Sequence, residues 1–205
     1  MKKWTVIIPT IWRSEYTLNL LEKYQNCEWV TEIILINNAP NRTPAEFIEH
    51  SKLVHYKTEN IYVNPAWNLG VSMASNDDIL ISNDDVDYDV DGAFRYVSGL
   101  VGWSVLGVDG KSYDQGFKEW GNRSGESLGF GWGCLIFAHK SEWINIPEGF
   151  KIWYGDNWIT KKHKAGSIQY KGGIETKMST SADGKDMIPV LRADTVYWNK
   201  IKHTL

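Results

Sequence analysis

Several features that would assign the chain to a specialised class are scarce. Its 205 residues include only two cysteines and six prolines, which excludes a disulfide framework and a proline-rich chain. The net charge of −3 provides no overall attraction to nucleic acid or anionic membranes. No apolar run is long enough to cross a bilayer, and no secretory signal pattern precedes the first apolar segment. We therefore expect a cytoplasmic protein with two free, buried thiols, Cys27 and Cys134, and without permanent membrane insertion.

Two residue types are abundant or unevenly distributed. The chain has eleven tryptophans, a residue that needs buried area for its ring and a partner for its N–H. Most should belong to a core, and a few should stack on flat ligands such as sugars or bases. Seven aspartates lie between Asp77 and Asp91, while nine lysines or arginines and four acids lie from Lys161 to Leu205. The basic segment is typical of a solvated surface, whereas the acidic cluster is too dense to be incidental.

The first ninety residues alternate between apolar β-branched runs and helix signals. Ser14 can cap a helix that runs to about Tyr24, and Thr43-Pro44-Ala45-Glu46 is a capping box with proline at the first helical position. Asn64-Pro65 repeats the cap-plus-proline signal, for a helix that runs to about Ala74. The predicted strands are Trp4–Ile8, Glu32–Ile36, Leu53–Lys57 and Ile79–Ser82.

This alternation predicts βαβ units and hence an α/β fold with a mostly parallel central sheet and helices on both faces. In such sheets, ligands bind beyond the carboxyl ends of the strands. Three predicted strands are followed by residue pairs that offer polar side chains, namely Pro9-Thr10, Asn37-Asn38 and Asp84-Asp85. We expect these pairs to lie along one edge of the sheet and to form a site there.

The second half of the chain is less regular. Its predicted elements are two strands (Val101–Val108 and Cys134–Ala138), two polar loops (109–127 and 172–187) and two helices (beginning at Asp156 and at Pro189). The glycine-rich stretch 129–133 is not a phosphate-binding loop, because no Gly-Lys-Ser/Thr follows it. Its glycines are instead expected to permit a close approach of backbone to a ligand.

The acidic cluster after the fourth predicted strand has two interpretations. Carboxylates at the carboxyl end of a strand are well placed to hold a hard divalent cation such as Mg²⁺ or Mn²⁺, whose other ligands are often phosphate oxygens. Such a cation would offset the charge of a diphosphate leaving group. The alternative is an Asp-rich surface turn that caps the next helix, a role that suits Asp91 before Gly92-Ala93-Phe94.

Four segments of the first ninety residues match a known family in order and spacing. They are Val6–Arg13, Ile33–Ala39, Asn68-Leu69-Gly70 with Ala74, and Ile79–Asp85. The first resembles the opening strand and loop of family 2 glycosyltransferases of the GT-A fold. The second resembles their second strand with its nucleotide-contacting end. The third is similar to their Asn-x-Gly helix, and the fourth to their Asp-x-Asp motif.

The resemblance implies a single GT-A-like domain over residues 1–205, with a nucleotide-binding half (1–92) and an acceptor-binding half (93–205). It implies transfer of a sugar from a nucleoside diphosphate, with a UDP-sugar as the leading donor, to an acceptor hydroxyl with inversion. It also implies a Mn²⁺ or Mg²⁺ cofactor, with Asp85 as the main ligand and Asp87 as a weaker candidate. The residues expected to contact the donor are Pro9, Thr10, Arg13, Asn37, Asn38, Asn68 and Asp84.

The same resemblance suggests a base and an acceptor site in the second half. The segment Trp153–Trp158 is similar to the family's aromatic and acidic stretch before a helix, with Asp156 in the place of the general base. A base must lie within hydrogen-bond reach of the acceptor hydroxyl. Asp156 can equally be a helix cap, and the helix N-terminus should lower its pKa. Trp132, Trp153 and Trp158 are candidate platforms for an acceptor sugar, with core packing as the alternative.

Three positions depart from the family's pattern. Asn37 stands where the second strand usually ends in Asp, which changes the hydrogen bonds available to a nucleobase. Trp67 stands in the place of a basic residue, and Gly155 in the place of the Glu of a Glu-Asp pair. One phosphate contact and one acidic group are therefore expected to be missing.

Two rival functions remain open from the sequence. A nucleotidyltransferase also combines an α/β sheet with metal-bound phosphates, although no glycine-rich loop with Lys or Arg follows the first strand here. A non-catalytic nucleotide- or sugar-binding protein is the second rival. The acceptor is not identified by the sequence: a glycan, a lipid-linked sugar, a protein, a small molecule and a modified nucleic acid all fit. The basic C-terminal part allows an anionic acceptor.

Overall fold

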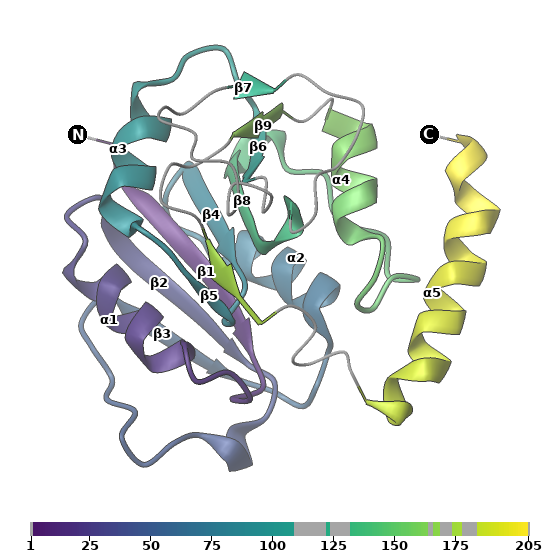
Figure 1. Ribbon diagram of the computed structural model, residues 1–205, viewed down its shortest axis with the longest axis horizontal. Helices are drawn as coiled ribbons and strands as arrows, with labels where there is room; N and C mark the ends of the chain where they lie inside the picture. Colours follow the sequence, from purple (N-terminus) through teal and green to yellow (C-terminus); the bar gives the residue numbers. More distant parts are fainter. Residues whose placement is uncertain are drawn as a thin grey trace.

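The computed structural model describes residues 2–108, 122–123, 132–163, 166–168, 174–177 and 184–204. An eight-stranded sheet with the order β3-β2-β1-β4-β8-β6-β9-β7 runs through the molecule (Figure 1). Its strands are β1 (Trp4–Thr10), β2 (Val30–Asn37), β3 (Leu53–Lys57), β4 (Asp78–Ser82), β6 (Val105–Val108), β7 (Asn122–Arg123), β8 (Leu135–His139) and β9 (Gly166–Ile168). A separate pair joins β5 (Val86–Asp87) to β10 (Glu175–Thr176).

The α-helices are α1 (Thr17–Asn26), α2 (Val63–Met73), α3 (Val90–Gly99), α4 (Gly155–His163) and α5 (Ile188–Ile201). Strands β3, β2, β1 and β4 are mutually parallel, and β6 and β9 form a fourth parallel pair. Strand β8 is antiparallel to both of its neighbours, β4 and β6. The prediction of an α/β fold around a mostly parallel sheet is confirmed.

The helices cover both faces of the sheet, as predicted, because the buried strands alternate apolar side chains between two cores. Val6 and Ile8 of β1 belong to the core that contains Tyr24 of α1 and Phe94 of α3. Ile7 belongs to the opposite core, which α2, α4 and α5 complete. A side chain at Gly70 would overlap Ile7, so the glycine of the Asn-x-Gly segment allows α2 to approach β1 closely.

The helix predicted from Thr43 does not form, and that prediction is wrong. The Thr43 hydroxyl donates to the Pro40 carbonyl (2.8 Å) and accepts from the Asn37 side chain (2.9 Å), so it does not cap a following helix. The Phe47 amide closes a single turn onto Pro44. The Phe47 ring then packs edge-on against Trp12 and against His55 in the middle of β3. These contacts hold the segment against the sheet, and no helix extends from it.

The other predicted strands and helices occur, with shifted ends. Helix α3 is capped by Asp89, whose side chain accepts from the Gly92 amide, and not by Asp91. Most of the predicted loop 109–127 lies outside the described residues, as does the stretch 129–131, while 122–123 form strand β7. Both cysteines are free and buried, as predicted. Among the described helices, none has the length and apolarity that a membrane crossing requires.

Candidate functional site

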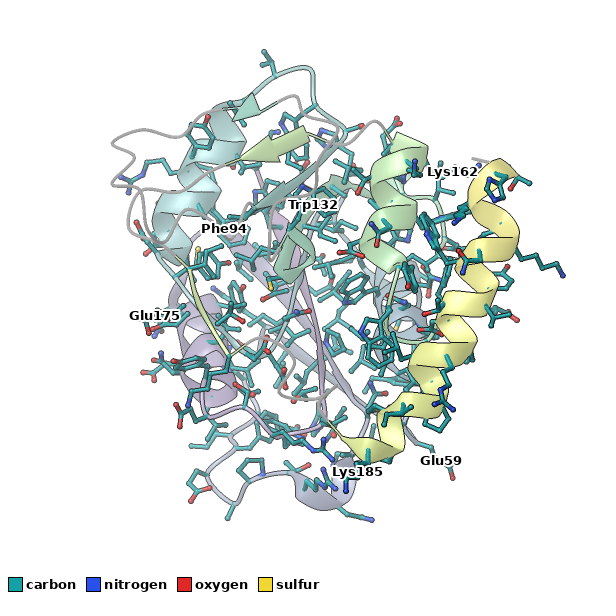
Figure 2. All side chains as sticks on the ribbon, turned by 45° about the vertical axis from the view of Figure 1, so that its right-hand side comes forward. Glu59, Phe94, Trp132, Lys162, Glu175 and Lys185 are labelled. Atoms are coloured by element: carbon teal, nitrogen blue, oxygen red, sulfur yellow. The ribbon has the colours of Figure 1, made fainter. Side chains whose placement is uncertain are left out.

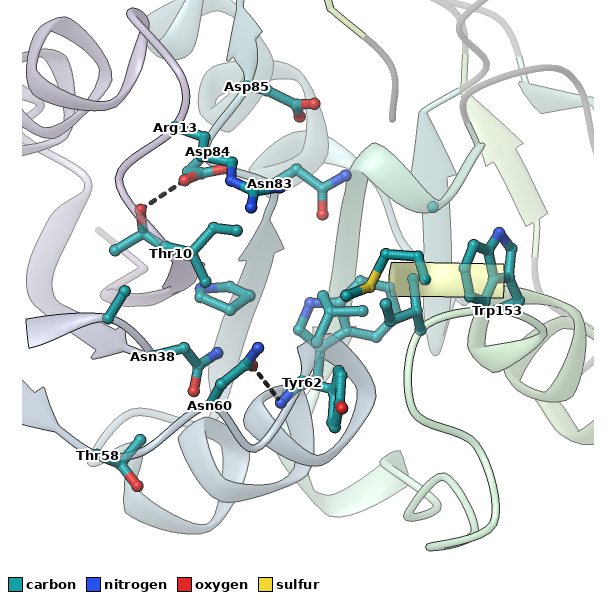
Figure 3. A pocket seen from close by; sticks show the side chains of 18 of the residues that line it. Thr10, Arg13, Asn38, Thr58, Asn60, Tyr62, Asn83, Asp84, Asp85 and Trp153 are labelled. Carbon is teal, nitrogen blue, oxygen red and sulfur yellow. Dashed lines mark hydrogen bonds between the residues drawn. The ribbon is translucent and has the colours of Figure 1, made fainter. Parts of the chain in front are cut away.

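A cavity of about 1080 Å³ lies at the carboxyl ends of the parallel strands, slightly larger than the usual size of small-molecule sites. One side of it, which we call the strand-end side, carries Thr10, Asn38, Asp84 and Asp85 (Figure 3). The other side is formed by an irregular segment, Lys151–Tyr154, which we call the wall, together with Trp132 and Asp156. Ile152, Trp153 and Tyr154 of the wall line the cavity.

The parallel register aligns the strand ends as the sequence predicted. Thr10 at the end of β1 pairs with Asn37 at the end of β2, and the Asn38 amide donates to the Thr10 carbonyl at 2.9 Å. The Thr10 hydroxyl donates to Asp84 Oδ2 at 2.5 Å across to the turn after β4 (Figure 3). This hydrogen bond joins two strand ends and orients the Asp84 carboxylate inside the cavity.

The two aspartates after β4 are poorly solvated. Asp84 and Asp85 are 7% and 8% exposed. Burial raises the pKa of Asp84 from 3.8 to about 7, with the Thr10 hydrogen bond opposing the shift and the neighbouring Asp85 adding to it. Burial raises the pKa of Asp85 from 3.8 to about 6. A cation bound beside these two carboxylates would therefore stabilise their charged forms strongly.

The acidic turn fits a divalent cation that takes one or two ligands from the protein. The Oδ1 atom of Asp85 is buried and has no hydrogen-bond partner among the described residues, and such an atom is costly to leave unsatisfied. No group of three His, Cys, Asp or Glu side chains in the described part of the chain could hold a metal ion. That is compatible with Mg²⁺ or Mn²⁺, which commonly combine one or two carboxylates with phosphate oxygens and water.

Asp87, the weaker metal candidate, does not share this position. It pairs with Lys23 of α1 and does not line the cavity. Strand β5 makes the difference, because pairing with β10 fixes Val86 and Asp87 in an extended conformation that leads away from Asp85. The structure therefore brings Asp84 and Asp85 together at the cavity and directs Asp87 elsewhere.

Asp156 enters the cavity from the first turn of α4. Burial raises its pKa, and the backbone amide of Asn157 at 2.8 Å only partly offsets that shift. The expected lowering of the Asp156 pKa by the helix N-terminus is thus outweighed by desolvation. Burial also raises the pKa of Cys134 to about 12, and the carboxylates of Asp85 and Asp156 both add to the rise. The two carboxylates therefore act on the same small region of the cavity.

The three candidate tryptophans occupy different environments. Trp153 lines the cavity from the wall (Figure 3). Trp132 (Figure 2) also lines it, but the residue is only 1% exposed. Its ring rests on Gly107, where any side chain would overlap it. Trp158 packs into the core on the α2 side of the sheet, with Lys162 over its ring, and is not among the lining residues.

Two of the seven predicted donor contacts lie away from the cavity lining, while Pro9, Thr10, Arg13, Asn38 and Asp84 lie within it. Asn37 is fully buried, and its side chain bonds to Thr43, to the Ala39 amide and to His55. Asn68 accepts from the Trp143 indole and the Ile146 amide and donates to the Ile146 carbonyl. Both asparagines hold loops in place, and their predicted contact with a donor stays a prediction.

Other lining residues were not foreseen from the sequence. They are Arg42, Lys57, Asn60, Tyr62, Trp67, Asn157, Asp186 and Met187, among others. Arg42 follows the end of β2, a position where ligand contacts are expected, but the predicted helix from Thr43 obscured it. Asp186 and Met187 come from the segment before α5, and no local sequence signal connects them with the strand ends.

Backbone strain is concentrated around the cavity. Trp12, Tyr62 and Tyr154 have φ values of 57°, 67° and 67°, a region that non-glycine residues seldom occupy. Tyr62 and Tyr154 line the cavity, and Trp12 lies between the lining residues Ile11 and Arg13. Such conformations persist only where surrounding contacts enforce them, and they gather at functional sites.

The missing acidic residue at position 155 has a steric explanation. Any side chain at Gly155 would overlap the side-chain oxygen of Asn64. Asn64 itself is 1% exposed and donates from Nδ2 to the Trp153 carbonyl at 3.3 Å. An asparagine on α2 therefore occupies the space that a longer residue at 155 would require.

Comparisons with known proteins identify the fold. No protein-family model matches the chain, and no curated protein matches it in sequence. The crystal structure of residues 1–349 of TarS from S. aureus matches 95% of this chain, with a TM-score of 0.63 and 15% identity. A structure of the same protein in complex with UDP-GlcNAc matches with a TM-score of 0.60. This chain spans 64% of that first TarS structure, somewhat less than two thirds of its length.

A second protein has the same architecture. Glucosyl-3-phosphoglycerate synthase from Mycobacterium tuberculosis, in complex with Mn²⁺, UDP and glucosyl-3-phosphoglycerate, matches 94% of this chain. The match covers 80% of that protein, with a TM-score of 0.60 and 10% identity. At these identities the similarity establishes the fold alone: the chain has the GT-A glycosyltransferase fold, as its motifs predicted.

Proposed function

We propose that this protein is a glycosyltransferase that moves a sugar from a UDP-sugar donor to an acceptor hydroxyl, with inversion at the anomeric carbon. The observation that supports it most is the buried, unpartnered Asp85 oxygen beside Asp84 in a large cavity at the strand ends. The proposal is also supported by the fold, since TarS binds UDP-GlcNAc and the mycobacterial synthase binds UDP. We assign the nucleotide to residues 1–92 and the acceptor to residues 93–205.

The donor would lie along the strand-end side. Thr10, Asn38 and the Pro9 backbone offer polar groups to the nucleoside, and Arg13 and Arg42 line the same cavity as cations for the diphosphate. Arginine suits this task because its planar fork can bond two phosphate oxygens at once. Asp84 is then a positioning group, tied to Thr10 at 2.5 Å.

A divalent cation, Mn²⁺ or Mg²⁺, would bind Asp85 and the donor diphosphate, with Asp84 close by. When bound, it supplies Lewis-acid neutralisation of the charge that develops on the departing diphosphate. Its presence in the mycobacterial synthase complex supports a metal of this class. The raised pKa values of Asp84 and Asp85 favour the same assignment, because burial deprives both carboxylates of water and a bound cation would stabilise their charged forms.

Asp156 is the proposed general base. The acceptor oxygen would form a bond to the anomeric carbon while the bond from that carbon to the diphosphate oxygen breaks, and Asp156 would take the acceptor proton. Its raised pKa strengthens the group as a base compared with an ordinary aspartate. Trp153 at the wall would pack against the acceptor or the transferred sugar.

The acceptor is proposed to be anionic. Four basic side chains are exposed on the two helices α4 and α5: Lys161 and Lys162 on α4, and Arg192 and Lys200 on α5. Figure 2 labels Lys162. The only carboxylate within α5, Asp194, is fully buried. The exposed surface of α5 therefore carries positive charge that would attract a negatively charged polymer or headgroup.

The proposed donor site is tested by thermal shift with UDP, GDP, CDP, ADP and dTDP, each with and without Mn²⁺. We expect UDP with Mn²⁺ to raise the melting temperature by about 5 to 10 °C at about 100 times Kd. Asp85→Asn should abolish the shift, and Asp87→Asn should retain it. The donor assignment is contradicted if no nucleotide raises the melting temperature, and the metal assignment if the Asp85→Asn shift is intact.

The two rival functions give different products. A nucleotidyltransferase would release pyrophosphate from a nucleoside triphosphate and a sugar phosphate. A glycosyltransferase releases UDP from UDP-GlcNAc or UDP-glucose as it transfers the sugar to an acceptor or, slowly, to water. A binding protein would show the thermal shift but would release neither UDP nor pyrophosphate.

A further inference from the structure

A buried carboxylate on α5 binds the wall of the cavity. Asp194 is fully buried, and its two oxygens accept three consecutive backbone hydrogen bonds. Oδ1 accepts from the Lys151 amide at 3.0 Å, and Oδ2 accepts from the amides of Ile152 and Trp153, both at 2.9 Å. Three N–H groups therefore converge on one carboxylate, 41 to 43 residues away along the chain.

The wall depends on such bonds because it belongs to neither a helix nor a strand. Its N–H groups lack the regular partners that secondary structure provides, and a buried amide without a partner is costly. Asn64 of α2 holds the wall from the other side: its amide donates to the Lys151 carbonyl at 3.0 Å and its side chain to the Trp153 carbonyl at 3.3 Å. The wall is thus held between α2 and α5.

Further contacts from α5 continue along the same segment. The Tyr154 ring stacks on Trp198 with centroids 5.4 Å apart, and its hydroxyl lies 3.1 Å from the Thr195 hydroxyl. Tyr154 adopts the left-handed backbone conformation with φ 67°, which these contacts enforce. The next two residues, Gly155 and Asp156, are the first of α4, so the conformation imposed on Tyr154 sets where α4 begins and where Asp156 lies.

We propose that Asp194 is a positioning residue: through the three wall amides it fixes Trp153 against the cavity and directs Asp156 toward the reacting atoms. The effect of Asp194 on turnover rests on the proposed function, whereas its role in holding the wall rests on the hydrogen bonds alone. Because the strand-end side is built from other elements, Asp194 governs turnover and leaves nucleotide binding unaffected. A misplacement of about 1 Å can cost about 100-fold in rate.

The test compares Asp194→Asn with Glu148→Gln in the full chain. Asparagine has nearly the same shape as aspartate but keeps only one accepting oxygen. Its side-chain NH₂ group cannot accept from a backbone N–H, so one or two of the three hydrogen bonds are lost while the fold should be retained. Glu148 is an exposed carboxylate just before the wall, so its substitution removes the same charge without touching these bonds. Asp194→Ala, which removes all three bonds, is a second variant whose folding is checked by circular dichroism.

Two readouts separate a positioning role from a merely structural one. With UDP-GlcNAc and Mn²⁺, we expect kcat for UDP release to fall about 10- to 100-fold in Asp194→Asn. We expect KM and the Kd of UDP to stay within about twofold of wild type. Amide hydrogen exchange at Lys151, Ile152 and Trp153 should accelerate in the same variant and stay slow in Glu148→Gln.

The outcomes distinguish this inference from the proposed function. An Asp194→Asn protein with unchanged kcat, or with unchanged exchange at the wall amides, overturns the inference. A kcat and a UDP affinity that fall together also overturn it, because that pattern indicates general loss of structure. If wild type releases no UDP from any UDP-sugar, the proposed function fails, and the exchange measurement alone then decides whether Asp194 holds the wall.

Discussion

The two sides of the cavity are built in different ways. The strand-end side consists of the carboxyl ends of β1, β2 and β4, where a parallel register aligns Thr10 with Asn37 and brings Asp84 within 2.5 Å of Thr10. The wall is irregular backbone, held by side chains of Asn64 and Asp194 that are distant in sequence. A regular sheet thus presents the groups proposed to hold the nucleotide, and long-range side-chain bonds present the group proposed to do the chemistry.

This difference has a functional consequence. The groups proposed to bind the nucleotide belong to the sheet and the loops at its end, so nucleotide binding should tolerate changes in α4 and α5. Positioning of Asp156 needs the wall, whose conformation includes a tyrosine at φ 67°. Strain of this kind is stable only while its supporting contacts are intact. The two sides should therefore be separable by mutation.

The largest expected effect is on the wall side. Asp156→Asn removes the proposed base and should lower kcat for UDP release from UDP-GlcNAc by about 100- to 10,000-fold. The Kd of UDP with Mn²⁺ should be unchanged, because Asp156 is not on the strand-end side. Steady-state kinetics and calorimetry on the same preparation measure both quantities. An equal loss of affinity and rate would mean that the two sides are not separable.

A pH dependence is expected on the strand-end side. The pKa values of Asp85 and Asp84 are raised to about 6 and about 7, and metal ligands bind in their deprotonated form. The affinity for Mn²⁺ should therefore rise with pH and level off above about 7, with a loss of about tenfold per pH unit between about 7 and 6 and of up to about 100-fold per unit below about 6, where both carboxylates are protonated. Calorimetric titration of Mn²⁺ between pH 5 and 8 tests this, and Asp85→Asn provides the background. An affinity that is flat across this range would argue against both carboxylates as ligands.

A steric prediction concerns the junction between the wall and α4. Gly155→Ala should lower the free energy of unfolding by about 1 to 3 kcal/mol, because the added methyl group overlaps Asn64. Gly99→Ala is the matched control, since nothing lies within 4 Å of its added carbon. Urea unfolding of the two variants measures the difference. Equal stabilities would mean that Asn64 moves aside without cost.

The smallest effect is expected at the ion pair between Lys23 and Asp87. Both side chains are about one third exposed, and such pairs contribute about 0 to 1 kcal/mol. Asp87→Asn should therefore change the free energy of unfolding by less than about 1 kcal/mol and leave UDP affinity unaltered. A large loss of Mn²⁺-dependent UDP binding in this variant would restore Asp87 as a metal ligand.

The sequence was informative where local patterns determine the structure. Apolar runs followed by Pro9-Thr10, Asn37-Asn38 and Asp84-Asp85 predicted the parallel sheet and its polar edge, because the carboxyl ends of parallel strands lie along one edge of a sheet. The GT-A fold was predicted by the resemblance of four segments to a known family. Local patterns failed at Thr43, whose hydroxyl bonds to Asn37 and Pro40 instead of capping a helix. There a tertiary contact of Phe47 with Trp12 outweighed a good capping box.

The wall could not be predicted for a related reason. Asp194 lies in a helix whose sequence pattern is typical of an amphipathic surface helix. Its partners are backbone amides, which every residue except proline has, so no sequence pattern points to them. The exclusion of a side chain at Gly155 depends on Asn64, 91 residues away. The raised pKa of Asp156 likewise depends on burial by the whole cavity and not on the helix end alone.

The separation of the two sides is tested most directly by measuring UDP affinity and UDP release together in Asp85→Asn and Asp156→Asn, with UDP-GlcNAc and Mn²⁺. We expect Asp85→Asn to lose both affinity and release, and Asp156→Asn to keep the affinity and lose release. A loss of affinity in Asp156→Asn, or wild-type binding and release of UDP in Asp85→Asn, would show that the two sides do not have separate roles.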